Sequence, residues 1–215
     1  KIVVFLLFIS ISAIAQNKKI KSEVILETKL SCRAILVDDE KVWMGMDKGR
    51  YGFYDKKKDT TIIKEIQSVA RTTEFRSIAG TKEAIFILAV GNPAMLIRID
   101  KKTLEETVVY KEEHEKVFYD SMQFVDDLNG FAMGDPIENC LAFIKTTDGG
   151  KSWQKVNCDV LPKVSEGEAA FATSNTNLTV KEKSIFMVSG GKKSRVFVSK
   201  DLGATWKVYE TPIIQ

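Results

Sequence analysis

The stretch TTDGGKSW at 146–153 returns further along the chain as SKDLGATW at 199–206. Both copies fit the pattern Ser/Thr-x-Asp-x-Gly-x-x-Trp. The Asp carboxylate of such a pattern accepts hydrogen bonds from loop amides, as in an Asx-turn. The Gly supplies a backbone angle that other residues avoid, and the Trp folds over the hairpin. We therefore predict a structural role, in two tight turns, for Thr146, Asp148, Gly150, Trp153, Ser199, Asp201, Gly203 and Trp206.

These turns belong to a longer repeat, which occurs four times between residues 32 and 210. Each repeat has an opening strand, a second apolar strand that ends near a Gly, a third strand that ends near an Asp, and a fourth strand after the turn. The opening strands are CRAILV (32–37), FRSIA (75–79), YDSMQFV (119–125) and AAFATS (169–174). The trailing acids are Asp55, Asp100, Asp148 and Asp201.

Four short strands in each unit of roughly 40–50 residues are typical of a β-propeller blade. The sequence thus predicts an all-β chain, a β-propeller with four four-stranded blades at 32–66, 75–110, 119–156 and 169–210. A β-sandwich of many short strands is the alternative, although it does not require this regular recurrence.

The two turns resemble the Asp-box, or BNR repeat, of sialidases and related propellers. In those families the box lies at the outer rim of the blade, away from the substrate face. The phrases FRSI (75–78), MGDP (133–136), EGEAAFATSNT (166–176) and SGGKKSRVFVSKDLGATW (189–206) resemble a family of secreted bacterial propellers, especially from Bacteroidetes, related to Ycf48-like assembly factors. Members are often labelled oxidoreductase or glycosyl hydrolase. The resemblance implies the fold and, through Ycf48, the binding of a client protein.

Residues 1–15, KIVVFLLFISISAIA, have the basic start, apolar middle and Ala-x-Ala end of a secretory signal peptide. We expect a secreted or periplasmic protein with no stable membrane span after cleavage. Disulfides persist outside the cytoplasm. Cys140 and Cys158 lie nearly opposite if the chain between them folds as a hairpin, and they could form a disulfide. The alternative is two separate buried thiols, and Cys32 is left over as a core residue.

The segment 16–31 precedes the first blade and contains SEVILET (22–28), which has the composition of a spare closing strand. The fourth blade already has its own last strand, TWKVYE (205–210). We therefore expect the chain to be a fragment of a six- or seven-bladed ring, with a closed four-bladed ring as the alternative.

Composition excludes several classes of function. The net charge of +3 gives no strong field for nucleic acid. One His and three Cys exclude a His-rich metal site or a multi-Cys zinc site. The chain has no G-x-G-x-x-G and no C-x-x-C, so we expect no metal and no cofactor.

The candidate site is the axial mouth of the ring. Arg76 and Arg195 would supply fixed positive donors. Asp135 and Glu168 would supply acceptors or, in an enzyme, acid and base groups. A sialidase-like site would instead need convergence of Arg33, Arg76 and Arg195. It would also need Tyr119 to pair with Glu168 as nucleophile and base.

We favour an exported binding or scaffold domain that recognises a protein or a glycan at this mouth. The alternatives are a sialidase-like glycoside hydrolase that acts on extracellular glycans and an oxidoreductase-labelled propeller of unknown chemistry. Fold alone does not decide among them, because propellers carry many unrelated activities.

Overall fold

The computed structural model describes residues 21–171 and 175–213. The signal peptide predicted for residues 1–15 lies outside the described residues. Within the two described ranges we find no helix long and apolar enough to cross a membrane.

Four antiparallel four-stranded sheets follow one another along the chain, and we refer to them as blades 1 to 4. Blade 1 contains β1 (Cys32–Asp38), β2 (Lys41–Met46), β3 (Arg50–Asp55) and β4 (Thr60–Glu65). Blade 2 contains β5 (Phe75–Gly80), β6 (Ala84–Ala89), β7 (Ala94–Asp100) and β8 (Glu106–Glu112). Blade 3 contains β9 (Tyr119–Phe124), β10 (Gly130–Pro136), β11 (Leu141–Thr146) and β12 (Gln154–Lys155), followed by the short 3-10 helix η1 (Cys158–Val160). Blade 4 contains β14 (Leu178–Lys181), β15 (Ser184–Val188), β17 (Arg195–Ser199) and β18 (Lys207–Glu210).

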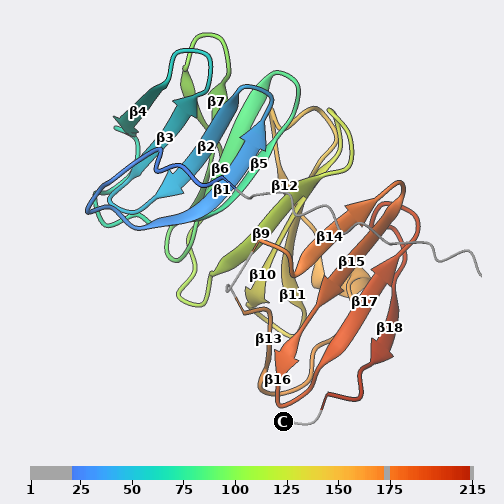
Figure 1. Cartoon of the computed structure of the whole chain (residues 1–215). Coiled ribbons are helices and arrows are strands. Elements are labelled where there is room, and N and C mark those ends of the chain that lie inside the picture. The colour runs from blue at the N-terminus through green and yellow to red at the C-terminus, as the bar shows by residue number, and fades with distance from the viewer. Residues whose placement is uncertain (1–20, 172–174, 214–215) are drawn as a thin grey trace, which may run out of the picture.

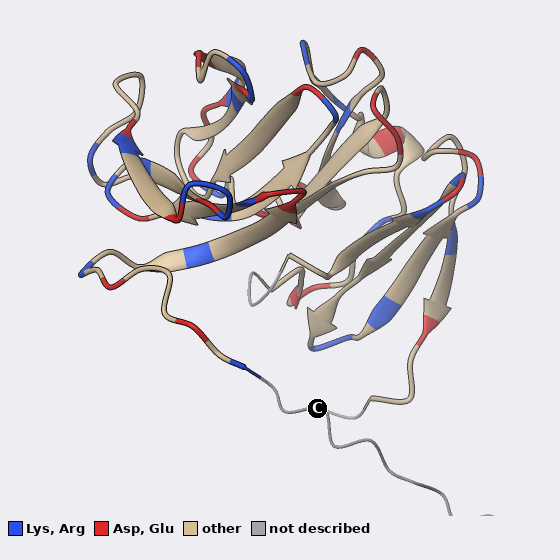
Figure 2. Ribbon diagram, turned by 45° about the horizontal axis from the view of Figure 1, so that its top comes forward, with Lys and Arg blue, Asp and Glu red and all other residues tan. Residues whose placement is uncertain are grey.

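The blades lie side by side in chain order (Figure 1). Their first strands are neighbours, since β1 packs beside β5, β5 beside β9, and β9 beside β14. Backbone bonds connect the start of a first strand to the end of the second strand of the same blade, as in Val90 N–H to Glu74 O and Asp135 N–H to Phe118 O. We call the end at which β1, β5 and β9 begin the mouth. Charged residues gather largely in the turns, whereas the strands consist mostly of other residues (Figure 2).

The core lies between the blades, and the two Trp residues of the turn pattern contribute to it. Trp153 of blade 3 packs edge-on against Phe86 of blade 2, with ring centroids 6.3 Å apart. Trp206 of blade 4 packs edge-on against Phe143 of blade 3, with centroids 5.5 Å apart. Each Trp therefore fastens its blade to the preceding one, because such aromatic pairs add to the burial of apolar surface.

The first strand of blade 4 corrects one prediction. It was expected at 169–174, whereas the structure begins it at Leu178. Of the expected segment, residues 172–174 lie outside the described residues. The pair β13 (Glu168–Ala169) and β16 (Gly190–Gly191) forms a separate short sheet instead. The physical reason is the path of the chain before β14. Asn175 lies away from blade 4 and forms hydrogen bonds with the first strands of blades 2 and 3.

This path places Asn175 between β5 and β9. Its side-chain oxygen accepts from Ser77 Oγ at 2.5 Å and from the Met122 N–H at 3.0 Å, and its Nδ2 donates to Ile78 O at 3.0 Å. First strands are edge strands of their sheets, so they present backbone groups without ladder partners. Asn175 satisfies some of these groups and ties three blades together.

The segment 22–28, expected as a closing strand, belongs to no sheet. Its Ile25 carbonyl accepts from Thr61 Oγ1 at 2.7 Å, so it lies beside β4 and contacts it through a side chain. A strand requires a backbone ladder, and this single bond does not provide one. Apolar side chains of both end blades remain open to solvent, with Val37 66% exposed on β1 and Val188 42% exposed on β15.

Candidate functional site

A β-bulge recurs at the second residue of the first strand in blades 1, 2 and 3. Cys32 and Ala34 pair with the consecutive residues Met46 and Gly45, which leaves Arg33 as the extra residue. The same irregularity falls at Arg76 in β5 and at Asp120 in β9. A bulge redirects a side chain and is common next to functional sites. Three blades thus have an ionisable residue within a bulge at the mouth end of the first strand.

The two arginines of this set share one carboxylate. Glu74 Oε2 accepts from Arg76 Nη2 at 2.9 Å, and Glu74 Oε1 lies 3.7 Å from Arg33 Nη1. The Arg33 side chain is 43% exposed and the Arg76 side chain 25%. The single negative charge of Glu74 therefore offsets only one of the two positive charges, and the mouth keeps an accessible positive charge on the side of blades 1 and 2.

Asp120 has the opposite environment. The residue is 1% exposed, and neither carboxylate oxygen has a hydrogen-bond partner among the described residues. Burial, followed by the negative charge of Asp135, raises the pKa of Asp120 to about 8, against the opposing effect of Arg76. The carboxyl group is consequently protonated in most molecules at pH 7.

Asp135, at the end of β10, lies next to this group. Its Oδ1 accepts from the Ala170 N–H at 2.8 Å, which joins blade 3 to the chain entering blade 4. The residue before it must be glycine, because a Cβ at Gly134 would lie 2.1 Å from Phe118 O and 2.8 Å from Tyr119 Cα. This close approach holds β10 against the bulged start of β9.

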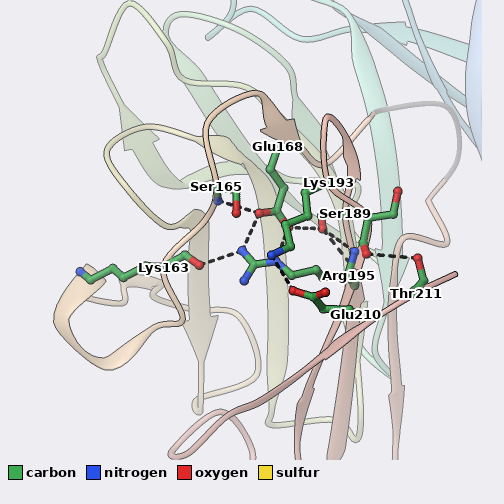
Figure 3. Close-up of polar contacts among 9 residues, drawn as sticks. Lys163, Ser165, Glu168, Ser189, Lys193, Arg195, Glu210 and Thr211 are labelled. Carbon is green, nitrogen blue, oxygen red and sulfur yellow. Dashed lines mark hydrogen bonds and ion pairs between the residues drawn. The ribbon is translucent and has the colours of Figure 1, made fainter. Parts of the chain in front are cut away.

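Glu168 and Arg195 form a separate, closed cluster (Figure 3). Arg195 donates to Glu168 through Nε at 2.9 Å and through Nη2 at 2.5 Å. The carboxylate also accepts from the Ser165 N–H at 2.7 Å and from Ser189 Oγ at 2.5 Å. Burial alone would raise the pKa of Glu168, but these donors outweigh it and lower the pKa. The Glu168 side chain is fully buried, so this pair braces the entry to blade 4.

The predicted sialidase-like arrangement does not form. Tyr119 donates through its hydroxyl to Glu112 Oε2 at 2.8 Å, whereas Glu168 is held by Arg195. Arg33 and Arg76 both lie beside Glu74, whereas Arg195 forms its ion pair with Glu168. Each expected partner therefore has a nearer counter-ion or acceptor in the fold.

The two tight turns have the same hydrogen bonds. Thr146 Oγ1 donates to Asp148 Oδ1 at 2.7 Å and accepts from the Gly150 N–H at 3.0 Å. Ser199 Oγ bonds in the same way to Asp201 and the Gly203 N–H, at 2.8 Å each. Burial alone would raise the pKa of Asp148, but hydrogen bonds from Ser152 and Thr146 lower it to about 2. Asp148 and Asp201 therefore form hydrogen bonds within their own turns.

The disulfide predicted from the alignment of the hairpin is present. Cys140 and Cys158 form a disulfide with their Cα atoms 5.6 Å apart, and Cys32 is a free thiol. Beside the disulfide, on the mouth side of blade 3, is a hollow of about 340 Å³ lined in part by Ile137, Leu141 and Val156. In the described residues, no group of three or more His, Cys, Asp or Glu side chains is placed to hold a metal ion.

No family model and no curated protein matches this chain. Solved structures do. U3-55K has a TM-score of 0.65 at 9% identity, over 87% of this chain and 54% of its own. The WD40 repeats of RRP9 have a TM-score of 0.64 at 9% identity, over 87% and 53%. The fold is a β-propeller.

A structure of Ycf48 bound to a D1 peptide also matches, at 12% identity and a TM-score of 0.49, over 87% of this chain and 71% of that one. The chain spans about half the length of the two WD40-type propellers. At these identities the comparisons establish the fold of the propeller alone, and the site must be judged from its own geometry.

In this propeller, the predicted site residues divide into two groups. Arg76 and Asp135 lie together at the mouth around Asp120, whereas Glu168 and Arg195 neutralise each other. Sequence reasoning missed Asp120 and Glu74. The signal for Asp120 was present in the repeat, because Cys-Arg-Ala, Phe-Arg-Ser and Tyr-Asp-Ser align with the charged residue in the middle. The signal for Glu74 was absent, since nothing in the sequence shows which of the loop acids reaches two blades.

Proposed function

We propose that this propeller is a binding or scaffold domain that holds a protein partner at its mouth. The observation that carries the proposal is the ionisable residue at the same bulge in three consecutive blades, Arg33, Arg76 and Asp120. The two arginines present accessible charge there. Fixed charges on a rigid sheet favour recognition of a complementary surface. The hollow beside Cys140 and Cys158, with both polar and apolar lining residues, supplies a neighbouring surface for contacts with a partner.

We also propose export and a larger ring. The signal-like residues 1–15 and the Cys140–Cys158 disulfide both support an oxidising compartment. The exposed apolar side chains on blades 1 and 4 support packing against further blades, in a ring of six or seven.

A photo-crosslinking experiment tests the binding function. A photoreactive amino acid replaces Glu138, which is exposed in the mouth turn after β10, or Lys102, which is exposed in a turn at the opposite end. In the cell that makes the protein, we expect a discrete crosslinked protein from position 138 alone. The crosslink should weaken at least tenfold in an Arg33→Glu, Arg76→Glu double variant. Equal crosslinking from both positions, or none from position 138, contradicts the proposal.

A glycoside hydrolase is the second candidate, and one observation favours it. Asp120 is a protonated carboxyl beside a second acid, Asp135, which is the combination that glycosidases use. This enzyme would hydrolyse aryl glycosides or sialosides, and Asp120→Asn would abolish turnover. A binding domain would show no turnover on such a panel, while a glycan array would reveal a glycan ligand in place of a protein.

A further inference from the structure

One feature that the fold does not explain is the buried carboxyl group of Asp120. Its two oxygens have no partner among the described residues, although the residue is 1% exposed. A buried polar group without a hydrogen bond reduces stability. The other buried carboxylate, Glu168, accepts four hydrogen bonds from three residues. A buried acid with a purely structural role is thus fully hydrogen-bonded in this protein, and Asp120 is not.

The surroundings place the Asp120 carboxyl just inside the mouth. The residue occupies a bulge at the mouth end of β9, and the charges that act on it are Asp135 on β10 and Arg76 on β5. Both of those residues are partly exposed. Arg76 does not neutralise Asp120, because its guanidinium donates to Glu74 at 2.9 Å, and its buried Nε has no partner among the described residues.

We propose that the mouth binds a primary ammonium group of the protein partner, with Asp120 as its counter-ion and Asp135 beside it. This proposal rests on the proposed function and adds the chemistry of the group that is recognised. The ligand group is the side chain of a lysine or a free α-amine, which share this chemistry.

Charge and hydrogen-bonding capacity favour an ammonium group over other ligands on the blade 3 side of the mouth. A carboxylate or phosphate would meet Asp135 on the blade 3 side and, once Asp120 has lost its proton, a second negative charge, and both repel it. An ammonium is compact and carries three donors for the unsatisfied oxygens of Asp120. A quaternary ammonium has the same charge but no hydrogen-bond donors. Comparing its affinity with that of a primary ammonium therefore separates the contribution of hydrogen bonds from that of Coulomb attraction.

The first test uses n-butylammonium chloride as the probe, with NMR chemical shifts of the full chain as the readout. We expect saturable shifts at Asp120, Arg76 and Asp135, and at least tenfold weaker binding of tetramethylammonium. Binding should strengthen by up to tenfold for each pH unit between pH 6 and 8, because Asp120 must release its proton first. Asp120→Asn should remove the binding. Asp39→Asn, an exposed acid at the opposite end, is the matched control and should leave it unchanged.

The wild-type chain alone gives a further readout, which does not depend on the folding of a variant. The carbon-13 signal of the Asp120 carboxyl should titrate at lower pH when the probe is bound. Two peptides then distinguish the sources: one has a blocked N-terminus and a free lysine, and the other has a free N-terminus and an acetylated lysine. The peptide that binds identifies the source.

Two results would overturn the inference: absence of saturable binding at pH 8, or equal binding by wild type and Asp120→Asn. The proposed function fails separately, if residue 138 gives no crosslink while butylammonium still binds. Conversely, a crosslink that survives Asp120→Asn undiminished would retain the protein partner and reject the ammonium site.

Discussion

Glu168 and Asp120 are two buried carboxyl groups that the fold treats in opposite ways. Four charge-assisted or neutral donor contacts hold Glu168 ionised and lower its pKa. Asp120 has no such donor among the described residues, so its pKa rises to about 8. Burial acts on both carboxyl groups, and the hydrogen-bond donors around Glu168 make the difference. Glu168 is therefore structural, whereas Asp120 is the group to which we assign a ligand.

Arg195→Met should destabilise the protein by about 3 kcal/mol, because it leaves the Glu168 carboxylate buried without its counter-ion. Urea unfolding at pH 7 measures the change. Arg71→Met is the control: Arg71 also pairs with a glutamate, at 2.9 Å, but its side chain is 83% exposed. We expect a loss below about 1 kcal/mol there. Equal losses in the two variants would contradict a structural role for the buried pair.

Asp120→Asn should stabilise the protein, and more so as the pH rises. The folded-state pKa of Asp120, about 8, lies above the unfolded value, so the folded chain holds an extra proton across this interval. Stability from this group is therefore full below about pH 4 and falls toward pH 8, by up to about 1.4 kcal/mol per pH unit. The asparagine variant lacks this slope. Thermal melts of both proteins from pH 5 to 8 would show the gap widen, and parallel curves would count against the assignment.

At the scale of elements, the tight turns of blades 3 and 4 show how short patterns specify local structure. The hydroxyl of Thr146 satisfies the buried Gly150 N–H, and Trp153 carries the turn onto the preceding blade. Residue types at fixed spacing were sufficient to predict the turn itself, because Thr146, Asp148 and Gly150 are close in sequence. The contact of Trp153 with Phe86 was not predicted, because Phe86 belongs to another blade.

Thr146→Val removes this hydroxyl while it keeps the shape of the side chain. We expect a loss of about 1–3 kcal/mol, since the Gly150 N–H is left buried without an acceptor. Thr147→Val, at the exposed neighbouring position, is the matched control and should change stability by less than about 0.5 kcal/mol. Denaturant unfolding compares the two, and similar losses would show that the hydrogen bond contributes little.

At the scale of the whole molecule, Asn175 connects blades that are distant in sequence. Asn175→Ala removes bonds to Ser77, Ile78 and Met122 at once, and about 2 kcal/mol of stability should be lost. Amide hydrogen exchange should accelerate in β5 and β9. Asn157→Ala, which removes only a local bond to Asp159, should leave both strands protected. Unchanged exchange in β5 and β9 would show that Asn175 does not couple the blades.

The sequence predicted the four blades, the strand order and the tight turns, because these depend on local periodicity and turn chemistry. It misplaced the first strand of blade 4 and the 22–28 strand. Asn175 satisfies backbone groups about 50 and 100 residues away, and no local pattern records such a contact. For the candidate site, it named Arg76 and Asp135, which the structure places at the mouth, but it assigned Glu168 and Arg195 to a ligand rather than to each other. Burial decides that question, and burial is a property of the assembled propeller.

The repeated bulge has a consequence for how such a protein can diverge. The ladder is in register on both sides of each bulge, so the partly exposed residues within those of β1 and β5 can be exchanged without repacking either strand against its neighbour. A single codon in each of these blades then resets one charge at the mouth. Blades of this kind can in this way acquire new selectivity stepwise, and a designer could screen positions 33 and 76 as a small combinatorial library on a constant scaffold.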